Sequence, residues 1–93
     1  MIRVEGNTMA IEGAVTLDNI CQLRETAKSN IGQADWTVDW SGVKEVDSTA
    51  LSLILAWQRE SADHGKQIHN VNLPANLQSL AELYGVVELI PVG

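Results

Sequence analysis

The residues best placed to do chemistry form the run Asp47-Ser48-Thr49, which stands directly before an apolar stretch. Side-chain oxygens at a helix entrance cap free backbone N–H groups, and the positive end of the helix dipole attracts anions. This run is therefore either a structural cap or a contact point for a phosphate or a partner's carboxylate. The residues alone favour the cap, because such oxygens are common there and each stabilises by about 1 kcal/mol.

Other candidates for catalysis are weak. His64 and His69 are separated across Gly65, which is not the helical spacing that places two imidazoles on one zinc ion. The sequence has neither the Gly-x-x-x-x-Gly-Lys-Ser/Thr phosphate loop nor the Gly-x-Ser-x-Gly nucleophile turn. We therefore predict a protein that is not an enzyme, binds no metal and needs no cofactor.

Size and charge narrow the class of protein. The 93 residues, 45% hydrophobic and 19% charged, suit one globular domain over residues 1–93. A net charge of −6, with scattered cations, argues against nucleic acid and anionic lipid as partners. No apolar run approaches the ~18 residues of a membrane span, and no signal-peptide pattern is present. We expect a cytoplasmic protein without direct membrane insertion.

The first third of the chain predicts a hairpin and a helix. Two alternating runs, residues 2–5 and 9–12, flank the turn residues Gly6 and Asn7. From Leu17 to Ile31 apolar residues recur at steps of three and four, which indicates a helix capped by Thr16. Cys21 lies next to this stripe, so we expect a packed thiol that is largely protected in the folded state.

The remaining residues alternate between strands and helices. Alternation predicts a strand over 36–40 that Ser41 and Gly42 stop, followed by a helix over 49–63. We expect a further strand over 67–73, a helix over 77–84 that includes Tyr84 on its apolar side, and a closing strand over 86–91. This order predicts an α/β fold with a mixed four- to five-stranded sheet flanked by about three helices.

The three tryptophans have different expected roles. Trp36 and Trp40 share one strand face, and we expect both in the core, because they supply much of the aromatic volume of a chain without Phe. Trp57 is open to two interpretations. It either packs beneath the sheet or anchors a partner, because interfaces are enriched in tryptophan near their centres.

At these residues the chain resembles the STAS family. Val38-Asp39-Trp40-Ser41-Gly42-Val43, and then Val46-Asp47-Ser48-Thr49-Ala50-Leu51, are similar to the family wording V-D-L-S-G-V followed by D-S-S/T-G-L. Known members are bacterial anti-sigma-factor antagonists and the cytoplasmic tails of sulfate transporters. The resemblance covers nearly the whole chain. Within the family, the segments 65–74 and 77–85 look most like the small stand-alone MlaB subunit, of toluene-tolerance type, of the Mla phospholipid transporter.

The resemblance implies a non-catalytic subunit that docks on the cytoplasmic ATPase of a phospholipid ABC transporter. Such a subunit would stabilise and regulate the ATPase, serve outer-membrane lipid asymmetry, and lie at the inner face of the membrane through its partner. In the transporter-type relatives the contact hydroxyl directly follows the Asp, which is Ser48 here. The expected partner-binding residues are Asp47, Ser48, Thr49, Ser52 and Trp57.

An alternative implied by the same family is an anti-sigma-factor antagonist that binds a kinase and is released by phosphorylation. The antagonists carry their phosphoacceptor at the third place of Asp-Ser-Ser/Thr, which is Thr49 here, with Ser48 as the adjacent candidate. Ala50 departs from the pattern, because it replaces the Gly that normally follows the acceptor. Its methyl group stands where a kinase loop would approach, so it weakens the phosphorylation hypothesis without affecting docking.

Overall fold

The described part of the chain, in a computed structural model, comprises residues 2–86 and residue 88. Its elements follow the order β1 (Ile2–Glu5), β2 (Thr8–Val15), α1 (Ile20–Ala27), β3 (Trp36–Val46), α2 (Thr49–Asp63), β4 (Ile68–Val71) and α3 (Ala75–Leu83). The expected closing strand over 86–91 falls, apart from residues 86 and 88, outside the described residues.

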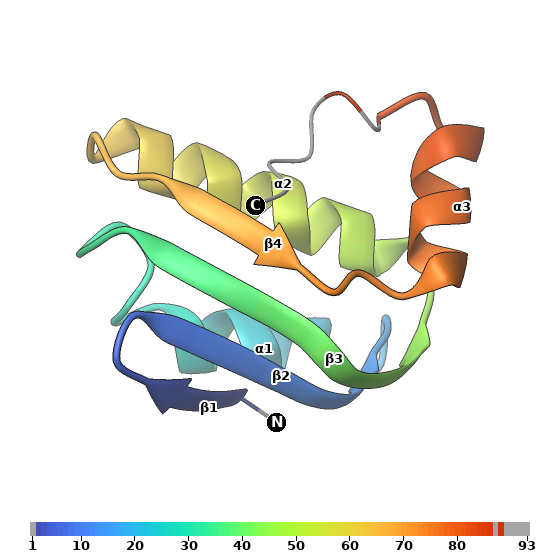
Figure 1. The fold of residues 1–93 in the computed structure, drawn as a ribbon, viewed down its shortest axis with the longest axis horizontal. Coiled ribbons are helices and arrows are strands. Elements are labelled where there is room, and N and C mark those ends of the chain that lie inside the picture. Colours follow the sequence, from blue (N-terminus) through green and yellow to red (C-terminus); the bar gives the residue numbers. More distant parts are fainter. Residues whose placement is uncertain (1, 87, 89–93) are drawn as a thin grey trace.

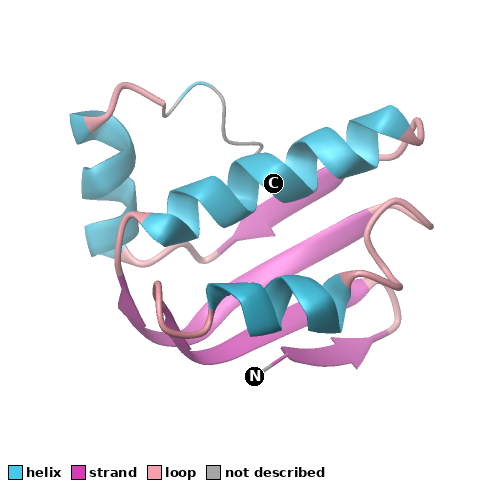
Figure 2. Cartoon of the chain, turned by 180° about the vertical axis from the view of Figure 1, so that it is seen from behind, coloured by secondary structure: helices cyan, strands magenta, loops and turns pink. Residues whose placement is uncertain are grey.

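One mixed sheet, in the order β1-β2-β3-β4, carries the fold. β1 and β2 form the expected antiparallel hairpin, whereas β2, β3 and β4 run parallel. Helices α1 and α2 both cover the same face of the sheet, as Figure 2 shows from behind. α3 stands at the end of the sheet near the start of α2 (Figure 1). The predicted α/β fold, with a mixed four- to five-stranded sheet and about three helices, is confirmed, since the described residues form four strands and three helices.

β3 is longer than the sequence predicts, because Ser41 and Gly42 form an irregularity within the strand and do not end it. The pairing of β2 with β3 shifts between Ala10 and Glu12, and again between Gly13 and Ala14. Each shift inserts an extra residue into β3 and so exchanges the faces to which its side chains point. A Cβ on Gly42 would lie 3.1 Å from the Ile11 carbonyl oxygen, so glycine permits the close approach of the strands.

α1 begins later than predicted, because Asn19 and not Thr16 organises its entrance. Asn19 Oδ1 accepts a hydrogen bond from the Thr16 N–H at 2.9 Å, and its amide donates to the Ala14 carbonyl at 2.6 Å. These bonds hold residues 16–19 as a loop. Leu17, expected on the buried stripe of the helix, therefore lies outside the helix with 71% of its surface exposed.

The prediction that Cys21 is packed is wrong. The helix starts at Ile20 and buries Leu23 and Ala27, so Cys21 falls on another side of the helix and is exposed. The predicted apolar stripe is correct from Ile20 onward, because Leu23, Ala27 and Ile31 are buried and Ile20 is half-buried. Cys21 lies about 100° around the helix from Ile20, and so it falls outside the buried face.

α2 follows the prediction closely, whereas α3 differs at its end. α2 spans Thr49–Asp63 and is followed by Gly65, whose φ of +70° suits glycine. α3 ends at Leu83, so Tyr84 lies just outside the helix, and 58% of that residue is exposed. The helix buries Leu77 and Ala81 instead.

The core beneath α1 and α2 contains all three tryptophans. Trp36 is 9% exposed and Trp40 fully buried, as predicted, and Trp57 is 1% exposed. The indole of Trp40 donates a 2.9 Å hydrogen bond to Oδ1 of Asn70, which is itself 1% exposed. A buried polar group is costly unless it is paired, so this bond joins β3 to β4 inside the core.

We predict that Asn70→Leu lowers the free energy of unfolding by about 1–3 kcal/mol, because the buried Trp40 N–H loses its acceptor. Urea unfolding followed by tryptophan fluorescence measures the change, with the exposed neighbour His69→Leu as the control. In the double variant Trp40→Phe, Asn70→Leu, the loss should be smaller than the sum of the single losses. Strict additivity would show that the bond contributes no stability.

Candidate docking site

The predicted site lies where two parallel strands end. β2 and β3 lead into loops that enter α1 and α2, and the carboxyl ends of parallel strands meet at one edge of a sheet. Figure 2 places the β2–α1 loop, the start of α2 and α3 at the same end of the molecule. Residues far apart in the sequence therefore share one surface.

The carboxylate of Asp47 connects these segments. Its Oδ1 accepts hydrogen bonds from the backbone N–H of Thr49, at 2.9 Å, and from the Thr49 hydroxyl. Its Oδ2 accepts the backbone N–H of Leu17 at 3.0 Å. Asp47 thus caps α2 and fastens the β2–α1 loop beside it.

These hydrogen bonds also shift the acidity of Asp47. The Thr49 hydroxyl, and next the backbone N–H groups of Leu17 and Thr49, hold the pKa of the Asp47 carboxyl below its usual value. Each donor stabilises the charged form and not the neutral acid. The Asp47 carboxylate is therefore ionised at neutral pH.

The two hydroxyls of the run have different surroundings. Ser48 takes the N-cap position with helical backbone angles, its side chain makes no capping bond, and it is exposed. Thr49 is partly buried, and its hydroxyl is occupied by Asp47. The expected cap is thus supplied by the Asp47 carboxylate and not by the hydroxyl of Ser48 or Thr49, which leaves Ser48 as the hydroxyl presented to solvent.

Ser52 lies one turn after Ser48 and is also exposed. Both serines line a shallow hollow of about 320 Å³ between α2 and the end of α3, with Leu51, Leu55, Tyr84 and Val86 as the remaining lining. The hollow has an apolar floor with hydroxyls on one side. Trp57, by contrast, is buried in the core, so packing beneath the sheet is the interpretation that the structure supports.

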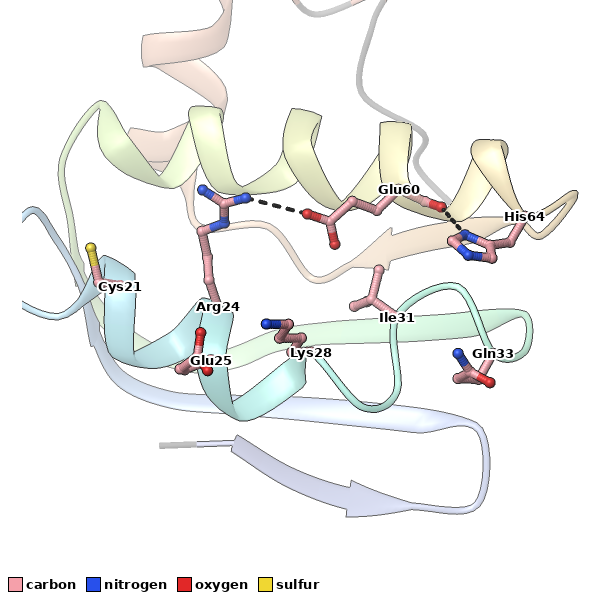
Figure 3. A pocket seen from close by; sticks show the side chains of 8 residues that line it. All are labelled: Cys21, Arg24, Glu25, Lys28, Ile31, Gln33, Glu60 and His64. Atoms are coloured by element: carbon pink, nitrogen blue, oxygen red, sulfur yellow. Dashed lines mark hydrogen bonds and ion pairs between the residues drawn. The ribbon is translucent and has the colours of Figure 1, made fainter.

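A second hollow, of about 580 Å³, lies between α1 and α2 (Figure 3). The Arg24 guanidinium pairs with the Glu60 carboxylate across it at 3.3 Å, and His64 Nδ1 lies 3.0 Å from the Glu60 carbonyl oxygen. Its other lining residues are Cys21, Glu25, Lys28, Ile31 and Gln33. Side chains of both charge signs therefore line this hollow. Of the two histidines, only His64 lies at it, because His69 is on β4.

The first site brings together groups that can make contacts with a partner. Among residues 2–86 and 88, no group of three His, Cys, Asp or Glu residues could hold a metal ion. No helix of that part is long and apolar enough to cross a bilayer. A clamped carboxylate, two exposed hydroxyls and an apolar hollow can together bind the surface of another macromolecule.

Solved structures share this fold. A protein described as an anti-sigma factor antagonist from Thermotoga maritima superposes with a TM-score of 0.79 at 12% identity, over 99% of this chain and 83% of that one. A chain of the Acinetobacter MlaFEDB complex, in an ATP-bound conformation, superposes with a TM-score of 0.79 at 15% identity over 95% of both chains. Unphosphorylated SpoIIAA gives 0.76 at 13% identity, over 100% and 86%.

These structures show that a chain of a transporter complex and anti-sigma-factor antagonists adopt this same fold. A family model described as MlaB, STAS domain, matches residues 2–91, so the chain belongs to the MlaB-type STAS family. The sequence has no significant match among curated proteins.

We predict that Asp47→Ala lowers the free energy of unfolding by about 0.5–2 kcal/mol, because α2 loses its cap and the β2–α1 loop its fastening. Ser48→Ala is the matched control and should change stability by less than about 0.5 kcal/mol. Amide hydrogen exchange at Leu17 should accelerate in Asp47→Ala alone. Unchanged exchange there would contradict the fastening.

We also predict that the contribution of Asp47 to the free energy of unfolding depends on pH. Because the pKa of Asp47 is lowered on folding, its stabilisation is present above its unfolded pKa of 3.8 and is lost as pH falls through the folded value. The difference in free energy of unfolding between wild type and Asp47→Asn should be constant between about pH 7 and pH 5, and shrink below about pH 4. An unchanged difference at about pH 3 would refute the assignment.

Proposed function

We propose that this protein is a non-catalytic subunit that docks on the cytoplasmic ATPase of a phospholipid ABC transporter of the Mla type. The observation that carries the proposal is the exposed Ser48, held at the entrance of α2 by residues that already satisfy the helix end. Because Asp47 does the capping, the Ser48 hydroxyl is available for a partner. The match to the MlaB-type family supports the choice of partner.

The docking surface in this proposal is formed by Ser48, Ser52 and the hollow beside them, and Asp47 holds the entrance of α2 in place. A partner side chain entering the hollow would bury the apolar floor of Leu51 and Leu55, while the two serines supply hydrogen bonds at its edge. Apolar centres with polar rims are characteristic of protein interfaces. Docking would stabilise the ATPase and set its activity, and would place this chain at the inner face of the membrane.

The alternative function is an anti-sigma-factor antagonist switched by phosphorylation of Thr49. The similarity of the fold to two anti-sigma-factor antagonists supports this alternative. The surroundings of Thr49 oppose it. Its hydroxyl is bonded to the Asp47 carboxylate, so a phosphate there would adjoin a like charge and displace the cap of α2.

The proposal predicts that Ser48→Glu abolishes binding to the ATPase while the chain stays folded. A carboxylate near a helix N-terminus is favoured by about 0.3–1 kcal/mol, whereas in an interface it would block close approach. Co-purification of the ATPase with the full chain measures binding, and thermal unfolding measures folding. Ser29→Glu, at an exposed serine beyond the far end of α1, is the matched control.

Variants at Thr49 and Ser48 distinguish the docking subunit from the phosphorylation switch. Thr49→Glu should lose stability as well as binding, because it removes the donor to Asp47. Normal ATPase binding by folded Ser48→Glu would refute docking at this site. Phosphate found on Thr49 in cells, together with release of a bound kinase, would favour the switch instead.

A further inference from the structure

Two exposed apolar residues, Leu17 and Tyr84, lie beside the α2 entrance. The described residues contain four large hydrophobic residues with more than a third of their surface exposed, and these are Val4, Leu17, Leu83 and Tyr84. Leu17 is bonded through its N–H to Asp47, and Tyr84 lines the same hollow as Ser48. Leu83 precedes Tyr84 in the chain. Exposed apolar side chains that cluster within a polar surface mark interaction sites.

Leu17 is held in its exposed position. Its N–H is bound by Asp47 Oδ2, while the preceding residue, Thr16, is bonded through its N–H to the Asn19 side chain. Both fastenings come from side chains, at 3.0 and 2.9 Å. A loop whose backbone is held in place loses less conformational freedom on binding than a flexible one.

The charge of the surrounding segments is uniformly negative. Residues 16–19, 47–52 and 82–86 contain the three carboxylates Asp18, Asp47 and Glu82, and none of the chain's six basic residues. Such a surface attracts a partner whose contact area carries Lys or Arg, and it repels an acidic one.

We infer that the docking surface extends from Ser48 in two directions, over Leu17 on the β2–α1 loop and over Tyr84 at the end of α3. Its occupant is an apolar patch, rimmed by Lys and Arg, on the ATPase subunit. Asp47 acts as a positioning residue that brings Leu17 to this surface. The inference rests on the proposed function, and it adds two exposed apolar side chains, those of Leu17 and Tyr84, to the docking surface.

The test uses the full chain and the ATPase subunit of the transporter from the same cell. We expect Leu17→Ser and Tyr84→Ser each to weaken the dissociation constant about tenfold or more, as central apolar contacts do. Val4→Ser, 47% exposed on the edge strand β1, is the matched control and should bind like the wild type. Unfolding temperatures should stay unchanged, because both side chains are exposed.

Charge is tested in the same assay. Asp18→Lys should weaken binding, and added salt should weaken the wild-type complex, whereas Asp63→Lys at the far end of α2 should leave binding unchanged. Equal effects of Asp18→Lys and Asp63→Lys would overturn the assignment of a basic rim to this surface.

The remaining outcomes are distinct. Wild-type binding by Leu17→Ser, together with loss in Ser48→Glu, would overturn the inference and leave the proposed function standing. No binding by the wild type would overturn both. If sedimentation shows that Leu17→Ser abolishes self-association while ATPase binding is unchanged, the occupant is a second copy of this chain, and the inference is wrong.

Discussion

The arrangement of the candidate site depends on one carboxylate. Asp47 accepts hydrogen bonds from the chain on both sides of it, namely from Thr49 at the start of α2 and from Leu17 in the β2–α1 loop. Without this carboxylate, the backbone N–H groups of Leu17 and Thr49 would lose the acceptor that joins the β2–α1 loop to the start of α2. Because both oxygens are occupied, Asp47 is an internal brace, and the neighbouring Ser48 is the residue that faces outward. In the proposed function, the structural role of Asp47 and the recognition role of Ser48 therefore fall on adjacent residues.

The position of Asp47 depends on the sheet that carries it. β3 lies between β2 and β4, and inside the core it is joined to β4 by the bond between Trp40 and Asn70. Trp57 packs from α2 into the same core, so the helix that carries Ser48 and Ser52 is seated firmly. Close-packed protein interiors have low compressibility, so a helix packed into such a core has a well-defined position. The residues proposed for docking are therefore carried by a preformed support.

The sequence predicted the structure correctly where the spacing and type of neighbouring residues determine the local conformation. The hairpin, α2 and the core positions of Trp36 and Trp40 follow from alternation, helical spacing and the burial of large apolar groups. It failed where a side chain far along the sequence decides the local structure. Leu17 belongs to a helical stripe by spacing, yet Asp47 and Asn19 hold it in a loop.

The candidate site shows the same division. The run Asp47-Ser48-Thr49 could be found from its residue types, because such oxygens mark helix entrances. The assignment of the cap to Asp47 and of the exposed hydroxyl to Ser48 needed the structure, since all three residues can play either part. The exposure of Tyr84 was not predicted, because Tyr84 continues the apolar spacing of α3, whereas the helix ends one residue before it.

The irregular pairing of β3 sets the length of chain that delivers Asp47 to its place. Thr8 pairs with Thr37, 29 positions on, but Val15 pairs with Val46, 31 positions on. The two added residues first reverse and then restore the inward face, so Trp40, Val43 and Val46 all point to the core side. Loss of one residue between 41 and 45 would turn Val46 outward and draw Asp47 away from Leu17. Changes in chain length should therefore be tolerated less well along this strand than in an ordinary surface loop, and a sequence alignment that places a single gap here would misplace the residues of the candidate site.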